Sequence, residues 1–75
     1  MKVSLIILHD KPVTVGVGAF SFPIENDQLH HNIESRNGCE YLNQIDKYNE
    51  AFELAHFAWT HQMFDEVIDN TGLQR

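Results

Sequence analysis

The stretch over residues 40–70 limits most strongly what this chain can fold into, because it contains neither glycine nor proline. Good helix formers are common in it, and apolar residues recur every three or four positions. Such a spacing places them on one stripe of an α-helix. The members of this first stripe are Tyr41, Ile45, Tyr48, Phe52, Ala55, Trp59 and Met63. The sequence therefore predicts one long C-terminal amphipathic helix, with Gly72 as its left-handed cap.

A second apolar stripe appears in the C-terminal half of this predicted helix. Its members are Leu54, Phe57, His61, Phe64 and Ile68. At about 100° per residue this stripe lies opposite the first, so the helix has to be buried on two faces. Three explanations are open. The helix breaks near residues 53–56 and folds back to merge both stripes, or the second stripe is a homodimer interface, or it docks a different protein.

The N-terminal part of the chain predicts an antiparallel β-hairpin. Its first strand, Val3–Leu8, is rich in branched residues and apolar on both faces. A polar turn separates it from a second strand over residues 13–22, where Gly16 and Gly18 indicate a bulge or a close packing neighbour. With the long helix packed on this hairpin, the expected fold class is α+β.

The middle segment, residues 24–39, allows two interpretations. One is a short helix that begins after Asn26, has Leu29 and Ile33 facing inward and ends at Gly38. The other is a type I′ turn at Asn37 and Gly38 between two short strands. The polar composition of the segment favours irregular structure with a short helix.

Length and composition predict a single domain over residues 1–75. A domain of this size buries only about 60% of the surface of its unfolded chain. Cys39 is the only cysteine, so stability has to come from the core or from another chain rather than from an internal disulfide. The longest apolar run, residues 5–8, is far shorter than the ~20 residues of a membrane span. Without a recognisable signal peptide, a cytoplasmic location is expected.

Negative charge is concentrated in the C-terminal half of the chain. The net charge is −6, and residues 40–75 hold seven acidic and two basic residues. Clustered lysine or arginine is missing from the sequence, which argues against direct binding of nucleic acid or of anionic membranes. The acids of the C-terminal half include two groups: Asp46, Glu50 and Glu53 on one helix face, and Asp65, Glu66 and Asp69. Such groups are usually solvated surface, and the alternative is a surface for a basic partner.

The residues that could carry chemistry lack the required spacing. His56 and His61 are five apart, so they lie on different faces of a helix and form no metal pair. A metal site assembled from distant segments stays open as an alternative, and its residues would be His9, His30, His31 and Cys39. The serines lack a nucleophile elbow, and residues 16–21 lack the third glycine of a dinucleotide-binding loop. The sequence therefore predicts no enzyme, no catalytic residue and no cofactor.

The leading functional prediction is a small acidic protein-binding module that associates with itself. It would be an adaptor or inhibitor that occludes the surface of a partner protein, with the second stripe as apolar interface and the two acidic groups as acidic interface. The first alternative is a decoy of a nucleic-acid-binding protein, because in size and charge alone the chain is similar to the small acidic proteins that phages and mobile elements use against host nucleases. The second alternative is a small metal-binding protein that uses scattered histidines.

Overall fold

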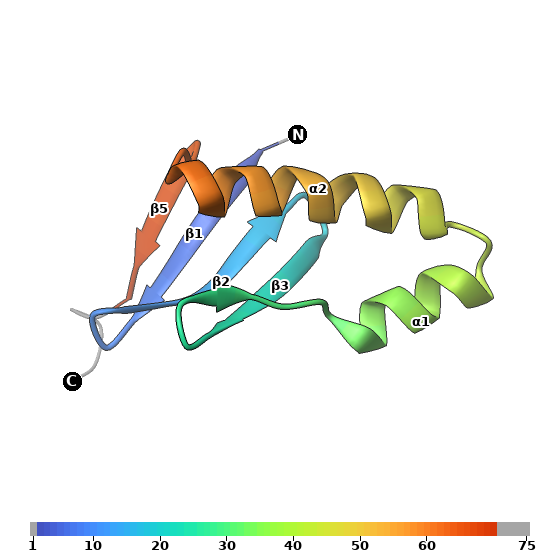
Figure 1. Ribbon diagram of the computed structural model, residues 1–75, viewed down its shortest axis with the longest axis horizontal. Helices are drawn as coiled ribbons and strands as arrows, with labels where there is room; N and C mark the ends of the chain where they lie inside the picture. The colour runs from blue at the N-terminus through green and yellow to red at the C-terminus, as the bar shows by residue number, and fades with distance from the viewer. Residues whose placement is uncertain (1, 71–75) are drawn as a thin grey trace.

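A computed structural model describes residues 2–70 and shows an α+β fold, with a five-stranded mixed sheet and two helices (Figure 1). The elements in chain order are β1 (Val3–Leu8), β2 (Lys11–Val17), β3 (Phe20–Glu25), β4 (Gln28–Leu29), α1 (Ile33–Tyr41), α2 (Ile45–His61) and β5 (Glu66–Asp69). The strand order is β4-β3-β2-β1-β5. The first four strands form an antiparallel meander, and β5 returns to pair parallel with β1.

Three two-residue turns connect the strands of the meander. His9 and Asp10 join β1 to β2, and Asn26 and Asp27 join β3 to β4, with positive φ at all four positions. This is the requirement of a type I′ turn, whose twist matches that of the flanking strands. Between β2 and β3 the positive φ of 59° falls on Gly18 alone, as in a type II′ turn. The local sequence at each turn therefore sets the register of the meander.

The hairpin prediction is correct for β1 and β2 as an antiparallel pair, and wrong for the length of the second strand. The strand predicted over residues 13–22 is two strands, because the chain reverses at Gly18 and Ala19. The sheet does contain an irregularity, but the register shifts between Ile6 and Ile7 of β1 rather than at a glycine. Of the two glycines, Gly18 therefore marks a turn between strands rather than a bulge within one strand.

The single long helix predicted over residues 40–70 is wrong. The end of α1, the whole of α2 and the strand β5 occupy these residues, and α1 begins before them. Asn43, with φ of 56°, lies in the loop that separates α1 from α2, and Gln62, with φ of 53°, caps the end of α2. A break near residues 53–56, one of the three explanations left open for the two stripes, is also ruled out, because α2 is continuous through these positions. The predicted cap Gly72 lies outside the described residues.

The middle segment contains a short helix, although not at the predicted position. Asn32 is the N-cap of α1, and its side chain accepts a hydrogen bond of 3.1 Å from the backbone N–H of Ser35. Ile33 is exposed rather than inward-facing, and Gly38 lies inside the helix rather than after it. The alternative type I′ turn at Asn37 and Gly38 is wrong, since both residues are helical.

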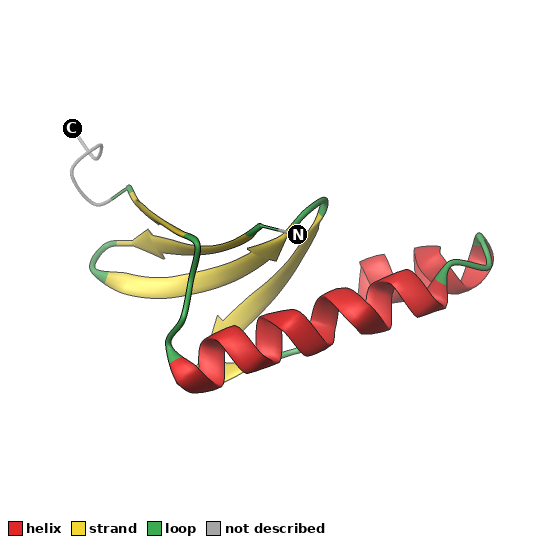
Figure 2. Cartoon of the chain, turned by 90° about the horizontal axis from the view of Figure 1, so that it is seen from above, coloured by secondary structure: helices red, strands yellow, loops and turns green. Residues whose placement is uncertain are grey.

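Helix α2 covers one face of the sheet and builds the core with it (Figure 2). Three buried alanines, Ala51, Ala55 and Ala58, let the helix approach the strands closely. The buried strand residues are Val3, Leu5, Val15, Val17, Phe22 and Ile24. The sheet-facing residues of α2 include most of the first predicted stripe, whereas its two ends, Tyr41 and Met63, are exposed. Neither described helix is long and apolar enough to cross a membrane.

Candidate protein-binding surface on helix α2

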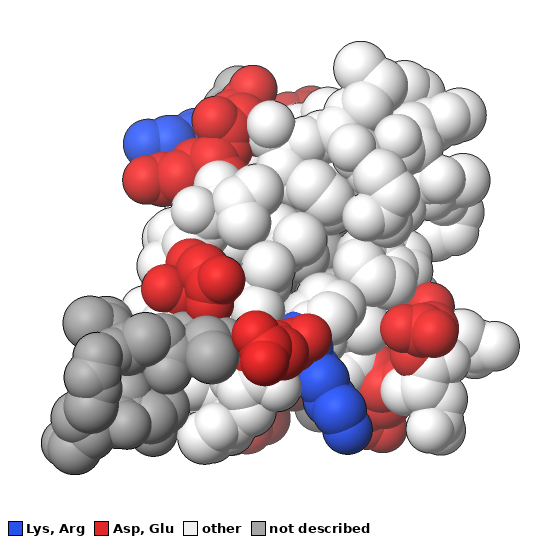
Figure 3. All heavy atoms as spheres, turned by 90° about the vertical axis from the view of Figure 1, so that its left-hand side faces the viewer, with Lys and Arg blue, Asp and Glu red and all other residues white. Residues whose placement is uncertain are grey.

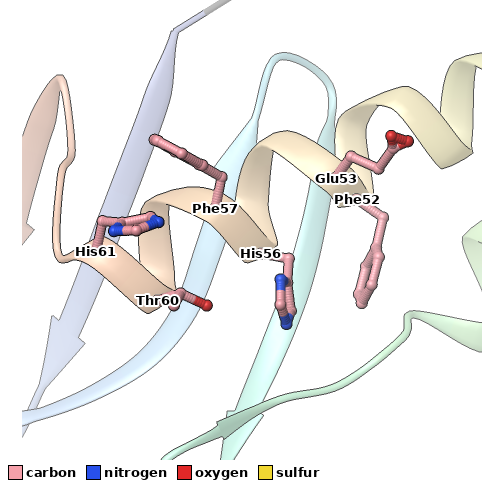
Figure 4. A pocket seen from close by; sticks show the side chains of 6 residues that line it. All are labelled: Phe52, Glu53, His56, Phe57, Thr60 and His61. Carbon is pink, nitrogen blue, oxygen red and sulfur yellow. The ribbon is translucent and has the colours of Figure 1, made fainter.

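The outer surface of α2 presents an exposed aromatic side chain. Phe57 is 55% exposed, and its position on the helix lies across from the buried Ala55 and Ala58. The ring of His61, one helical turn further on, lies beside it with 4.3 Å between ring centroids. The two rings therefore form one aromatic surface that points away from the sheet (Figure 4).

An open depression of about 400 Å³ lies on the same surface of α2. It is lined by Phe52, Glu53, His56, Phe57, Thr60 and His61. Figure 4 shows Phe57 and His61 on one side of the helix and the side chains of Phe52 and His56 on the other, with Glu53 at one end. Aromatic walls with a few polar groups are typical of surfaces that bind another molecule.

Hydrogen bonds hold one wall of this depression in place. The ring of His31 stacks on Phe52 with 3.9 Å between centroids, and its Nδ1 lies 2.9 Å from the hydroxyl of Tyr48. The same hydroxyl accepts a hydrogen bond of 3.1 Å from the backbone N–H of Asn32. Because Tyr48 is fully buried, this network connects the start of α1 firmly to α2.

One of the two predicted acidic groups lies on this surface. Asp46, Glu50 and Glu53 are exposed, and their spacing of four and three residues places them on one side of α2. No ion pair involves these carboxylates within residues 2–70. Asp46 also lies in the first turn of α2, where a negative charge stabilises the helix. Glu50 and Glu53 have no such role, so their charge is available to a partner.

The predicted apolar interface is not one helical stripe, because α2 ends at His61. Leu54, Phe57 and His61 are exposed on α2. Phe64 lies after the helix and packs partly buried against the core, while Ile68 lies on β5. The structure therefore brings together three of the five predicted residues and separates the other two.

The second acidic group connects β5 to β1. A side-chain oxygen of Asp65 accepts a hydrogen bond of 2.8 Å from the backbone N–H of Val3, and Glu66 forms an ion pair of 3.0 Å with Lys2. Asp69 ends β5. Figure 3 shows acidic side chains scattered over the end of the molecule where β5 lies, with more acidic than basic surface. Asp65 and Glu66 thus have structural partners of their own.

The histidines and the cysteine do not gather into a metal site in the described part of the chain. Among residues 2–70, no three His, Cys, Asp or Glu side chains lie close enough together to hold a metal ion. Cys39 is buried in α1, and His31 is occupied by Tyr48 and Phe52. The described residues therefore give the metal-binding alternative no support.

Two contacts of this region were missed at the sequence level. The sequence separates His31 from Tyr48 by 17 positions, and adjacent histidines gave no sign that one of them would stack on a helix. The indole of Trp59 donates to the backbone oxygen of Asp27, at 3.1 Å, across 32 positions. Only the capping pattern at Asn32 could have been recognised locally.

Comparison with known proteins assigns no family to the chain. No protein-family model matches it, and no curated protein or solved structure is significantly similar to it. The function is therefore argued from the surface of α2.

Proposed function

We propose that the protein is a small acidic binding module that docks on a basic partner protein through the outer surface of α2. By covering the partner's surface it acts as an adaptor or an inhibitor. The observation that carries the proposal is Phe57, a large aromatic side chain that is more than half exposed next to carboxylates that form no ion pair within residues 2–70. Exposed aromatic residues of this kind are common anchors of protein interfaces.

The charge of this surface favours a partner rich in lysine or arginine. Glu50 and Glu53 lie on the same side of α2 as Phe57, so a partner that covers the ring also meets both carboxylates. Complementary charges around an apolar anchor raise the association rate and disfavour acidic partners. The proposal therefore commits to an apolar contact at Phe57 with basic groups around it.

A peptide titration tests this proposal. Isotope-labelled protein is titrated with a helical peptide that carries a leucine stripe flanked by lysines, and the amide signals are followed by NMR. We expect the shifted signals to lie on the outer surface of α2, and Phe57→Ser to weaken binding by about tenfold or more. Asn49→Ser, a change at an exposed position of α2 outside the depression, is the matched control and should leave binding unchanged.

Two results would contradict the proposal. One is equal binding of a peptide in which glutamates replace the lysines, because the acidic surface would then have no role. The other is a set of shifted signals confined to the sheet. A partner that ignores Phe57→Ser but is lost with Glu50→Lys would instead favour the decoy function, which needs the charges without the aromatic anchor.

A further inference from the structure

The face of the sheet opposite α2 has no helix over it within residues 2–70 (Figure 2). Side chains alternate along a strand, so Leu5 of β1 faces the helix and its neighbour Ile6 faces the open side. On β5, Val67 pairs with Leu5 and Ile68 pairs with Ile6. Two isoleucines from adjacent strands therefore lie next to each other on the open face.

A hollow of about 430 Å³ lies on this open face beside the isoleucines. Among the residues that line it are Ser4, Ile6, Gly16, Ser21 and Ile68. The fold does not require a glycine at position 16, because its φ is not positive and an added Cβ would meet only the backbone oxygen of Phe20 at 3.8 Å, an ordinary contact. A glycine inside a strand without such a need is typical of a place where another molecule approaches closely.

The hollow on this open face is poor in charge. Lys2 is the charged residue among those that line it. Its 3.0 Å ion pair with Glu66, the β5 partner of Ser4, leaves the two together without net charge. Glu25 lies on the same face at the far end of β3, away from the hollow. The whole chain carries −6, and the outer surface of α2 carries three acids. A second copy is therefore repelled more strongly at the helix surface than at the hollow of the open face.

We propose that two copies of this chain associate through the open faces of their sheets. An interface around a twofold axis has to be self-complementary, and this face offers both a hollow at Gly16 and the isoleucines that can fill it. Four strands that are about 4.8 Å apart and about 20 Å long form a sheet face of roughly 400 Å², which is the area that each copy can bury. This is half of what a stable interface buries, so the dimer is weak and forms reversibly. The inference uses a surface separate from that of the proposed function.

Sedimentation equilibrium tests the inference on the intact protein. The apparent mass should rise from 8.7 kDa toward twice that value as the concentration increases from ~10 μM to ~1 mM. Ile68→Glu should raise the dissociation constant about tenfold or more. Val67→Glu is the matched control, because Val67 is the adjacent residue of β5, is 55% exposed and faces the opposite side of the sheet. We expect it to change the constant by less than about twofold.

The outcomes separate the open face from the other surfaces. A mass that stays monomeric at ~1 mM overturns the inference, and so does a dimer that survives Ile68→Glu but is lost with Val67→Glu or Phe57→Glu. If circular dichroism shows that Ile68→Glu perturbs the fold, Ser21→Glu at an exposed position of the same hollow takes its place. The Ile68→Glu variant should still bind the lysine peptide, because that peptide contacts the outer surface of α2. The two proposals can therefore fail independently.

Discussion

At the residue scale, the hydroxyl of Tyr48 is the group whose removal should cost most for its size. Tyr48→Phe removes the hydrogen-bond partner of Nδ1 of His31 and of the backbone N–H of Asn32. His31 is exposed and Asn32 is half-buried, so water can reach the groups that lose their partner. A hydrogen bond of this kind contributes about 0.5–1.5 kcal/mol, so urea unfolding should show a loss in that range. Tyr41→Phe is the control, because Tyr41 is 89% exposed and its change should stay within about 0.5 kcal/mol. Equal losses for both variants would mean that the network does not stabilise the fold.

Two glycines of the meander should respond to alanine with opposite signs. Gly16→Ala should stabilise the monomer by about 0.5–1 kcal/mol, because a strand interior disfavours glycine and the added methyl group has room. Gly18→Ala should destabilise it by about 1–2 kcal/mol, because the φ of 59° is left-handed. Thermal unfolding at low protein concentration measures both changes on the monomer. If Gly16→Ala lowered the stability, the added methyl group would have less room than the 3.8 Å distance to the oxygen of Phe20 indicates.

At the scale of elements, the sequence predicted what local chemistry controls. The strand β1 was recognised by its run of branched apolar residues, and the sheet-facing side of α2 was recognised by its spacing. The end of β2 was missed because Gly18 and Ala19 were taken as strand rather than as a two-residue turn. The helix breaks were missed because Asn43 and Gln62 adopt positive φ without a glycine or proline to mark the place.

The strand β5 could not be predicted for a different reason. Its four residues contain one apolar pair, Val67 and Ile68, which in isolation fits a helix as well as a strand. What makes it a strand is the pairing with β1 across about 60 positions of the chain, with partners such as Ser4 and Glu66. Tertiary contacts of this range are not visible in a local pattern. This explains why the predicted apolar interface included Ile68, which lies in the strand β5 and not on the helix with the other members.

The attachment of β5 gives the prediction at this scale. Asp65→Ala removes the acceptor of the 2.8 Å bond from the N–H of Val3, and hydrogen bonds to charged groups contribute about 1.5–3 kcal/mol. Because all of β5 is exposed, we expect the strand to open locally and the amide of Asn70, which donates to Ile7, to exchange about tenfold faster or more. Glu66→Gln should change the rate little, since its ion pair with Lys2 is exposed. Unchanged exchange at Asn70 in Asp65→Ala would show that backbone pairing alone holds β5.

At the scale of the whole molecule, the fold places two surfaces of different character on opposite sides. The outer surface of α2 combines Phe57 with carboxylates, and the open face of the sheet combines Ile6 and Ile68 with the ion pair of Lys2 and Glu66. From the sequence alone the helix surface could be predicted in part, because Leu54, Phe57 and the acidic group lie on one helix. The open face could not be predicted, because it depends on which side of the sheet α2 covers.

The two surfaces should respond to salt in opposite directions. The Debye length falls from about 30 Å at 0.01 M to about 10 Å at 0.1 M ionic strength, so added salt screens charges on the surface. Binding of the lysine peptide at α2 should weaken, because the attraction to Glu50 and Glu53 is screened. Association of two copies should strengthen, because the repulsion between two chains of charge −6 is screened while the apolar contact remains. Calorimetric titration of the peptide and sedimentation of the free protein, each at both ionic strengths, measure the two effects. If added salt changes both dissociation constants in the same direction, one surface serves both kinds of binding. Comparing Phe57→Ser with Ile68→Glu in both experiments would then show which surface it is.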